Sequence, residues 1–158
     1  MTIEELLSLE EIRNLRIGYA AHMDAQDVDA LAALFTEDAV CEFGSYGTWS
    51  GRRTIRENYV SVMAQVVRPF DAIHVVTNPW VQLTSSDTAH GRWYLIEMLP
   101  TQHPESGLAT QGGHENPLFY LGIYEDEYRK VEGRWLIARV KLHFLWPERV
   151  GNGPQSVR

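Results

Sequence analysis

The segment YEDEYRKVEGRWLIARVKL, residues 124–142, sets the structural class of the second half of the chain. It is rich in β-branched and aromatic residues, which favour extended backbone, and its central pair Glu132-Gly133 is typical of a hairpin turn. The segment therefore predicts two strands joined by a tight turn. The same signals recur upstream, and the predicted strands cover residues 72–83, 88–99, 118–131 and 134–146.

The first half of the chain has helical periodicity instead. Apolar residues recur at spacings of three and four, which predicts helices that each bury one stripe of side chains. Asp27 has the side chain of an N-cap and is expected to begin the second helix. Before the third helix, TEDAVCEF (36–43) predicts a turn leading into a brief strand, and GSYGTWSG (44–51) predicts a glycine-rich hairpin or loop. The predicted helices cover residues 8–24, 28–35 and 53–67.

Helices followed by a run of long strands indicate the α+β class, with the helices packed on one face of a mixed or antiparallel sheet. The chain has 158 residues without a repeat or linker, so we predict one domain over residues 1–158. A strongly curved sheet of this kind leaves an apolar hollow beneath the helices, where a small molecule is expected to bind. The stretch over residues 100–117 lacks periodicity and is expected to be a lid or binding loop.

Composition argues against several partners. The formal charge is −7 and no lysine or arginine cluster occurs, which argues against nucleic acid or an anionic membrane surface. No apolar run approaches the ~20 residues of a membrane span, and the single cysteine, Cys41, suits a protein of the reducing cytoplasm. The sequence lacks the glycine-rich loop that would indicate a dinucleotide cofactor. His74 and His90 lack a third partner for a metal, so we expect neither cofactor nor metal.

His74 is the one titratable residue of the apolar strand segment AIHVVTNPWVQL, residues 72–83. An imidazole has an unperturbed pKa of about 6.5, so a small shift makes it an effective base at neutral pH. A histidine in this setting is either a core residue with satisfied hydrogen bonds or a catalytic base. Pro79, in the same segment, is expected to interrupt the strand ladder at a bulge or an edge.

The end of the first predicted helix supplies candidate partners for His74. The segment GYAAHMD, residues 18–24, places Tyr19 and Asp24 five positions apart, about 140° around a straight helix. The two residues reach one hollow only if the helix frays near Asp24; otherwise Asp24 simply ends the helix. Together, Asp24, His74 and Tyr19 provide an orienting carboxylate, a base and a hydroxyl donor. Those groups can remove a proton from carbon and stabilise the charge that develops.

Apolar and aromatic side chains are expected to line the hollow. Each is also compatible with ordinary core packing, but as a set they favour a hydrophobic, polycyclic or aromatic substrate over a sugar or a nucleotide. Tyr46, in the glycine-rich segment, is a candidate assisting residue. The predicted lining residues are Trp49, Tyr59, Met63, Val76, Asn78, Trp80, Tyr94 and Met98.

Four stretches carry a resemblance to a known family: EEIRNLRIGYAAHMDAQDVDALAALFTEDAVCEF, GRRTIRENY, AIHVVTNPWVQL and YEDEYRKVEGRWLIARVKL. From about residue 5 to 147, the chain resembles the SnoaL-like family of the nuclear-transport-factor-two-like superfamily, whose fold is a cone-shaped α+β structure. The similarity is greatest to the branch that contains scytalone dehydratase, bile acid 7α-dehydratase and hexachlorocyclohexane dehydrochlorinase. The superfamily also includes isomerases, cyclases, dioxygenase β subunits and proteins without chemistry, so the resemblance specifies a fold more sharply than an activity.

The resemblance implies roles for particular residues. In that branch, an aspartate at the end of the first helix and a histidine early in the next long strand form a catalytic dyad, and these positions correspond to Asp24 and His74. Tyr19 falls where bile acid dehydratase has a functional tyrosine. The branch also uses a basic residue in the last long strand. Arg139 and Lys141 are the nearest candidates, but the residue between them aligns most directly, so a bulge would have to turn one of them inward.

Residues and resemblance together predict a cofactor-independent lyase or isomerase, similar to a dehydratase, that acts on a small hydrophobic substrate by Asp-His general base catalysis. The alternative is a non-catalytic ligand-binding protein, or a structural subunit similar to the β chains of ring-hydroxylating dioxygenases. A cyclase or a hydrolase would use the same acid–base groups. Because the outer face of such a sheet usually needs cover, we also expect a homo-oligomer, and family analogy favours a dimer or a trimer.

Overall fold

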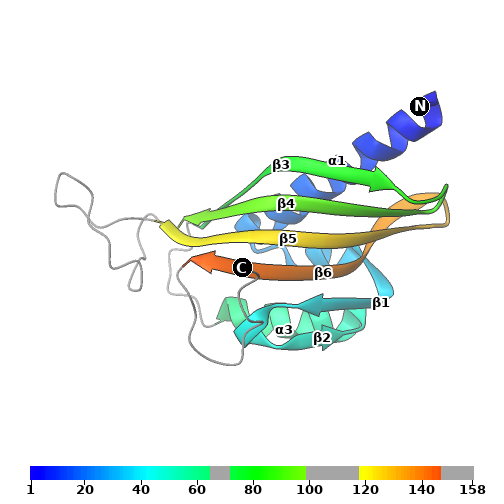
Figure 1. Ribbon diagram of the computed structural model, residues 1–158. Coiled ribbons are helices and arrows are strands. Elements are labelled where there is room, and N and C mark those ends of the chain that lie inside the picture. Colours follow the sequence, from blue (N-terminus) through cyan, green and yellow to red (C-terminus); the bar gives the residue numbers. More distant parts are fainter. Residues whose placement is uncertain (65–71, 99–117, 147–158) are drawn as a thin grey trace, which may run out of the picture.

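The computed structural model describes residues 1–64, 72–98 and 118–146, which form three α-helices and one six-stranded sheet (Figure 1). The α+β prediction is confirmed. The predicted loop over residues 100–117 and the end of the third predicted helix lie outside the described residues. The helices are α1 (Ile3–Ala25), α2 (Val28–Ala33) and α3 (Arg52–Ala64), with a short 3₁₀ turn, η1, at Gly44–Tyr46. The strands are β1 (Phe35–Glu42), β2 (Thr48–Ser50), β3 (Ile73–Leu83), β4 (Thr88–Met98), β5 (Leu118–Val131) and β6 (Arg134–Trp146).

The sheet is mixed and open, with the strand order β2-β1-β6-β5-β4-β3. β1 runs parallel to β6, and all the other neighbouring strands are antiparallel. β5 and β6 form the hairpin predicted from the sequence. Glu132 and Gly133 have φ values of 49° and 79°, as the two central residues of a type I′ turn require, so the turn sets the register of this strand pair.

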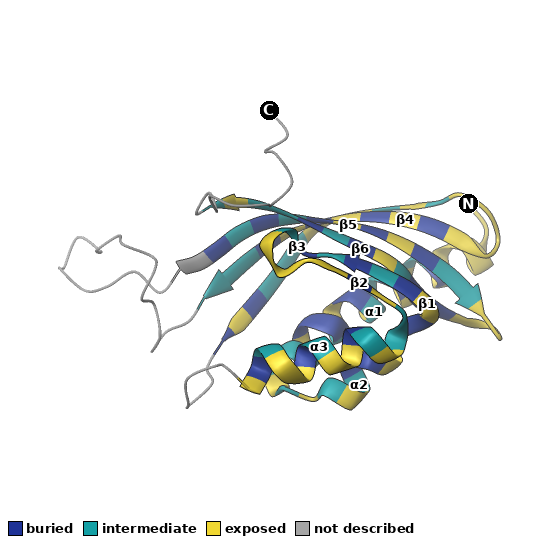
Figure 2. Ribbon diagram, turned by 90° about the horizontal axis from the view of Figure 1, so that it is seen from below, coloured by how far each residue is buried: buried dark blue, intermediate teal, exposed yellow. Residues whose placement is uncertain are grey.

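The described helices all lie against one face of the curved sheet, the inner face (Figures 1 and 2). Side chains alternate between this face and the opposite, outer face: in β4, Trp93 and Leu95 are buried, whereas Arg92 and Tyr94 are exposed. Burying each large apolar side chain contributes about 1.5–3 kcal/mol, so the inner face holds the helices on the sheet. The most deeply buried core residues are Ile12, Leu31, Phe35, Ala39, Cys41, Ile55, Ile137 and Val140.

Two caps define the ends of the first helices. α1 begins at Ile3, earlier than its predicted start, because Thr2 and Glu5 form a capping box. The Thr2 hydroxyl accepts a hydrogen bond from the backbone N–H of Glu5 at 3.1 Å, and the Glu5 carboxylate accepts one from the backbone N–H of Thr2 at 2.7 Å. At α2, the side chain of Asp27 accepts a hydrogen bond from a first-turn backbone N–H at 3.0 Å, which confirms the predicted N-cap. None of the helices in the described ranges is long and apolar enough to cross a membrane.

β1 occupies a segment for which the sequence predicts a turn and then a brief strand. Residues 36–38 are polar, yet they are extended, because the residues on either side of this stretch pair with β6. The register of this pair shifts between Phe35 and Val40, so the polar stretch is the irregular part of the strand. Tertiary pairing therefore overrides the local preference for a turn. The following segment forms the predicted hairpin, with β2 antiparallel to β1.

β3 is an edge strand with a bulge. Its register against β4 shifts between Thr77 and Trp80, and Asn78 adopts a φ of 51°. This irregularity confirms the interruption predicted at Pro79, which cannot donate a hydrogen bond to the ladder.

Candidate active site

Asp24 and His74 form a hydrogen-bonded pair. The Oδ1 atom of Asp24 lies 2.6 Å from Nδ1 of His74, and the backbone N–H of His74 donates to the same carboxylate at 3.1 and 3.3 Å. Because an ionised carboxylate only accepts hydrogen bonds, Nδ1 carries a hydrogen, and Nε2 of the neutral ring keeps the lone pair that a base needs. The structure thus brings together the two residues that the sequence analysis pairs.

The pair joins two elements that the fold places side by side. Asp24 lies in the last turn of α1, and His74 is the second residue of β3, which packs against α1. α1 stays regular to Ala25, so the fraying that would let Asp24 and Tyr19 share one hollow does not occur. The side chain of His74 is 5% exposed and that of Asp24 is 31% exposed. The ring is therefore enclosed, while its carboxylate partner remains partly open to solvent.

Glu97 is a third member of this cluster, and the sequence analysis does not predict it. It is the cross-strand neighbour of His74 in the β3–β4 pair, and its Oε1 atom lies 3.5 Å from Nε2 of His74. The imidazole therefore has a carboxylate near each ring nitrogen. The signal that would have found Glu97 is the one that identifies His74, an ionisable residue inside an apolar strand segment, here YLIEM at residues 94–98.

The charges around His74 stabilise its protonated form. Burial lowers the pKa of His74, but the hydrogen bond to Asp24 and the negative charges of Glu97 and Asp24 outweigh burial and the smaller opposing charge of Arg16. The net pKa of His74 is raised above the ordinary value of about 6.5. The neutral ring, which is the form that accepts a proton, is therefore populated only at higher pH than in a free histidine.

Replacing Glu97 with glutamine is expected to lower the pKa of His74, because the substitution removes one of the two negative charges that favour the imidazolium. The measurement is an NMR titration of the His74 ring, assigned by comparison with His74→Gln. Glu125→Gln is the matched control, since Glu125 lies on the outer face and bonds His143 there at 2.7 Å. An unchanged pKa of His74 in Glu97→Gln, or an equal shift in the control, would contradict the assignment.

Tyr19 lies away from this hydrogen bond, although the sequence analysis groups it with Asp24 and His74. Its hydroxyl is 2.6 Å from that of Tyr59, and its ring packs edge-on against Phe35. Burial raises the pKa of Tyr19 to about 12, against the opposing charge of a neighbouring arginine, so the phenol is neutral at physiological pH. Tyr59, one of the predicted lining residues, is thus the partner of Tyr19.

Arg16 is a buried cation that the sequence analysis misses. Its side chain is 0% exposed, and Nε lies 3.4 Å from Oδ2 of Asp126, which is equally buried. The guanidinium lies 3.6 Å from the ring centroid of Tyr124 and 4.2 Å from that of Tyr19, within cation–π range of both. The signal was its position in the helix: Arg16 follows Ile12 by four residues and therefore lies on the same buried stripe.

The buried ion pair is embedded in an aromatic network. The Tyr128 hydroxyl donates to Asp126 at 2.6 Å and accepts a hydrogen bond from the indole N–H of Trp93 at 3.0 Å. Burial raises the pKa of Asp126, while the positive charge of Arg16 opposes that rise. Burial also disfavours the charged form of Arg16, but Asp126 and the tyrosines outweigh it and raise the pKa of the guanidinium. Each charge therefore favours the ionised form of the other inside the core.

Tyr46 forms a second hydroxyl pair, with Tyr120. Their oxygens are 3.0 Å apart, and Tyr46 reaches Tyr120 from η1. Tyr120 is the cross-strand neighbour of Glu97, which in turn neighbours His74, so these three residues form one row across the inner face. Tyr46 is the predicted assisting residue, whereas sequence reasoning did not single out Tyr120.

Several predicted lining residues belong to the inner side of the molecule. Trp49, Tyr59 and Met63 are buried in the core, where the ring of Trp49 packs edge-on against that of Tyr59 at a centroid distance of 5.2 Å. Val76 packs at the margin of the same core. Met98 is half-buried at the end of β4, four residues after Tyr94, so the alternation of the strand places it on the outer face, which corrects its predicted place in the lining.

Three other predicted lining residues also lie away from the inner side. Tyr94 is 40% exposed on the outer face, because the alternation of β4 turns Trp93 inward instead. Trp80 is 56% exposed beyond the bulge of β3, and Asn78 is an exposed residue of the bulge itself. Trp93 and Tyr94 lie on opposite faces of β4, so the prediction that Tyr94 lines the interior is wrong.

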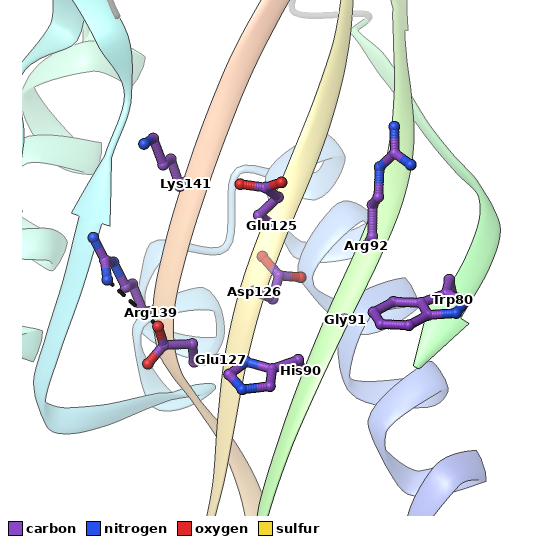
Figure 3. Close-up of a pocket in the computed structure, with 9 residues that line it drawn as sticks. All are labelled: Trp80, His90, Gly91, Arg92, Glu125, Asp126, Glu127, Arg139 and Lys141. Carbon is purple, nitrogen blue, oxygen red and sulfur yellow. Dashed lines mark hydrogen bonds and ion pairs between the residues drawn. The ribbon is translucent and has the colours of Figure 1, made fainter. Parts of the chain in front are cut away.

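Arg139 and Lys141 also lie on the outer face, which corrects the prediction that one of them assists from within. The residue between them, Val140, is fully buried, so no bulge turns either cation inward. Arg139 instead binds the carboxylate of Glu42 at 2.7 and 3.0 Å. The two cations border a hollow of ≈ 350 Å³, shown in Figure 3 and lined by Trp80, His90, Gly91, Arg92, Glu125, Asp126, Glu127, Arg139 and Lys141.

Within the described ranges, no group of three or more histidine, cysteine, aspartate or glutamate side chains is spaced to hold a metal ion.

An open, curved mixed sheet with helices on its inner face is the architecture of nuclear-transport-factor-two-like proteins, whose fold is also described as cystatin-like. The chain belongs to the SnoaL-like domain family, whose model matches residues 4–141. The family and fold that the resemblance implies are therefore confirmed.

Solved structures of similar fold come from several bacteria. A scytalone dehydratase-like protein from Novosphingobium aromaticivorans has 22% identity and a TM-score of 0.79, with 100% of this chain and 99% of that chain covered. Hexachlorocyclohexane dehydrochlorinase LinA-type3 from Novosphingobium barchaimii has 21% identity and a TM-score of 0.69, with 91% and 90% covered. A protein assigned as an aromatic ring hydroxylase from N. aromaticivorans has 29% identity and a TM-score of 0.69, with 90% and 92% covered.

Proposed function

We propose that the protein is a cofactor-independent lyase or isomerase that removes a proton from carbon in a small hydrophobic substrate. The observation that carries the proposal is the contact between Asp24 and His74, with Glu97 near the opposite ring nitrogen. An imidazole held by a carboxylate is the usual arrangement of a general base. The similarity of the fold to a dehydratase-like protein and to a dehydrochlorinase supports the same class of reaction.

In the proposed reaction, Nε2 of His74 takes the proton. The electron pair of the broken C–H bond forms a new carbon–carbon double bond, and the neighbouring carbon loses hydroxide or halide with its bonding electrons. In an isomerisation, the proton returns to another carbon instead. Asp24 fixes the tautomer and balances the imidazolium charge, and Glu97 adds to that stabilisation. Where the leaving group or an adjacent group is an oxygen, the hydroxyl of Tyr46, whose side chain is 41% exposed, would donate to it as negative charge builds.

The inner face supports a hydrophobic substrate. Two aromatic rings that are not fully buried lie at the Tyr120 end of the row formed by His74, Glu97 and Tyr120: Tyr46, which is 41% exposed, and Phe144. Such rings favour flat apolar molecules, and the tyrosine hydroxyls provide a few polar contacts that orient them. Hydroxylated steroids, aromatic polyketides and halogenated hydrocarbons combine an apolar body with a leaving group and are the classes to test.

The test is incubation with a panel of these three classes, followed by mass spectrometry for loss of water or of hydrogen halide. The same incubation in heavy water detects isomerisation, because a returned proton carries deuterium into a product of unchanged composition. We expect turnover of at least one class by the wild-type protein, and its loss in His74→Gln. Binding of a compound without conversion or deuterium uptake across the panel would count against an enzyme.

The second candidate is a non-catalytic subunit or ligand-binding protein. The enclosure of the His74 ring, whose side chain is 5% exposed, favours this alternative. In that case the Asp24–His74 hydrogen bond would be structural. Ligand affinity and protein stability, rather than any rate, would then respond to Asp24→Asn.

A further inference from the structure

Glu97 lies on the side of His74 from which a substrate must approach. Nε2 is the ring atom that takes the proton in the proposed reaction, because Nδ1 is bonded to Asp24. The Oε1 atom of Glu97 is 3.5 Å from Nε2, and Glu97 is the cross-strand neighbour of His74. A reacting carbon that comes within about 3–3.5 Å of Nε2 therefore also brings its own substituents within reach of the Glu97 carboxylate.

The Glu97 carboxylate belongs to the inner face of the sheet. It continues the alternation of Trp93 and Leu95, which are buried on that face of β4. The Glu97 side chain is 16% exposed, compared with 5% for that of His74. Because solvent and salt screen a partly enclosed charge less than a surface charge, this carboxylate discriminates more strongly between ligands of opposite charge.

The formal charges of Asp24, His74 and Glu97 sum to a negative value whether or not the imidazole is protonated. The two carboxylates contribute two negative charges, and an imidazolium offsets only one of them. Arg16 is a cation of the same core, but Asp126 already balances its charge at 3.4 Å. A substrate anion beside Nε2 is therefore repelled by this cluster, whereas a hydrogen-bond donor or a cation is attracted.

We propose that Glu97 determines specificity: it selects substrates with a hydroxyl or another hydrogen-bond donor on or beside the reacting carbon, and it rejects those with an anion there. This selectivity rests on the proposed function, which places the reacting carbon at Nε2 of His74. A hydrogen bond from a donor to a carboxylate is charge-assisted and about twice as strong as one between neutral groups. The hydroxyl that Glu97 holds stays in the product, because accepting its hydrogen bond makes it a poorer leaving group.

The selectivity of Glu97 narrows the substrate classes. Hydroxylated steroids and aromatic polyketides can carry a hydroxyl besides the leaving group, whereas halogenated hydrocarbons have no donor for a carboxylate. The row from His74 through Glu97 to Tyr120 presents a base, an acceptor and a phenol on three neighbouring strands. Because neighbouring strands are ~4.8 Å apart, one flat polyhydroxylated ring system can contact all three groups. The preferred substrate is therefore a neutral, polyhydroxylated ring compound.

The experiment measures the binding of naphthalene probes that share one apolar body and differ in one substituent: 2-naphthylmethylammonium, 2-naphthylmethanol, 2-methylnaphthalene and 2-naphthoate. Isothermal titration calorimetry at pH 7 gives the dissociation constants. We expect the ammonium and the alcohol to bind wild-type protein about tenfold or more tightly than the naphthoate. In Glu97→Gln, the ratio of the naphthoate constant to the ammonium constant is expected to fall by about tenfold or more. Glu97→Leu removes the acceptor and is expected to abolish the advantage of the alcohol over 2-methylnaphthalene.

Glu125→Gln is the matched control, because it removes one negative charge from the outer face, where Glu125 bonds His143. It should keep the wild-type ratio, which separates the local effect of Glu97 from that of the formal charge of −7. Circular dichroism shows whether each variant is folded. A wild-type ratio in folded Glu97→Gln, an equal change in the control, or the absence of binding by every probe would overturn the proposal.

Probe binding needs no turnover, so the selectivity and the proposed reaction fail separately. A preference that depends on Glu97, without conversion of any compound in the panel, supports the donor-selective site and removes the enzyme. Conversion of a halogenated hydrocarbon without a hydroxyl, with a kcat/KM equal to that of a hydroxylated compound, supports the enzyme and overturns the selectivity.

Discussion

Replacing His74 with glutamine is expected to lower kcat by about 10²–10⁴-fold on the compound that the protein converts, because general base catalysis contributes rate factors of that size. Glutamine keeps hydrogen-bonding capacity toward Asp24 but cannot take up a proton. Asp24→Asn is expected to lower kcat as well, since an amide can hold Nδ1 in the wrong tautomer. Steady-state rates with the substrate found in the panel provide the measurement.

The control for both variants is His90→Gln, because His90 lies on the outer face, away from the proposed site. Its rate should equal that of the wild-type protein. Unchanged turnover in His74→Gln, with the protein folded, would remove the dyad from the reaction and leave the hydrogen bond a structural feature.

Replacing Arg16 with methionine is expected to lower the free energy of unfolding by about 3–5 kcal/mol, because it leaves the Asp126 carboxylate buried without its counter-ion. Urea unfolding followed by circular dichroism measures the change. Arg16→Met/Asp126→Asn removes both charges and keeps an acceptor for the Tyr128 hydroxyl, so it is expected to be more stable than Arg16→Met alone.

Arg139→Met is the matched control for Arg16→Met. Arg139 also pairs with a carboxylate, but its side chain is 44% exposed, so the loss is expected to be about 1 kcal/mol or less. Equal losses for the buried and the exposed arginine would contradict the view that the Arg16–Asp126 pair stabilises the packing of α1 on the sheet.

Most of the fold could be predicted from the sequence because the strands of the second half carry their own signals. Wherever the end of a strand is described, the predicted bounds of β3 to β6 agree with the observed bounds to within one residue. The turn residues Glu132 and Gly133 have the positive φ values that a tight hairpin turn requires. The errors in the predicted secondary structure arise where a segment's conformation depends on pairing with a strand that is distant in the sequence. Residues 36–39 are extended because of β6, which no local pattern reveals.

The site could be predicted only in part. The position of His74 in an apolar strand and the family resemblance identify Asp24 as its partner, and the two are in contact. Glu97 and Arg16 were not predicted as residues of the site, because each is a charged residue on an apolar stripe. Such a residue is ordinarily interpreted as an interruption of the apolar pattern. Whether it is buried depends on a counter-charge from another element, His74 for Glu97 and Asp126 for Arg16.

One property of the strands could not be predicted from the alternation of their side chains, namely which of the two faces is covered by the helices. A period of two separates Trp93 from Tyr94 and Val140 from its neighbours, but it does not say which set faces the helices. The correct choice follows from α1, which covers the face that holds Trp93 and Val140. The cations of β6 are consequently surface residues, and the buried positive charge of this protein comes from Arg16 of the first helix instead.

The central claim is that His74, with its raised pKa, is the base of the reaction. The most direct test compares the pH profile of kcat/KM with the pKa of His74 measured by NMR in the free protein, since kcat/KM reports the ionisations of the free enzyme. The neutral ring is the active form, so kcat/KM should rise with pH and level off above that pKa, and the rise should move to lower pH in Glu97→Gln. A profile that is flat through that pKa, or that falls as His74 loses its proton, would contradict the account.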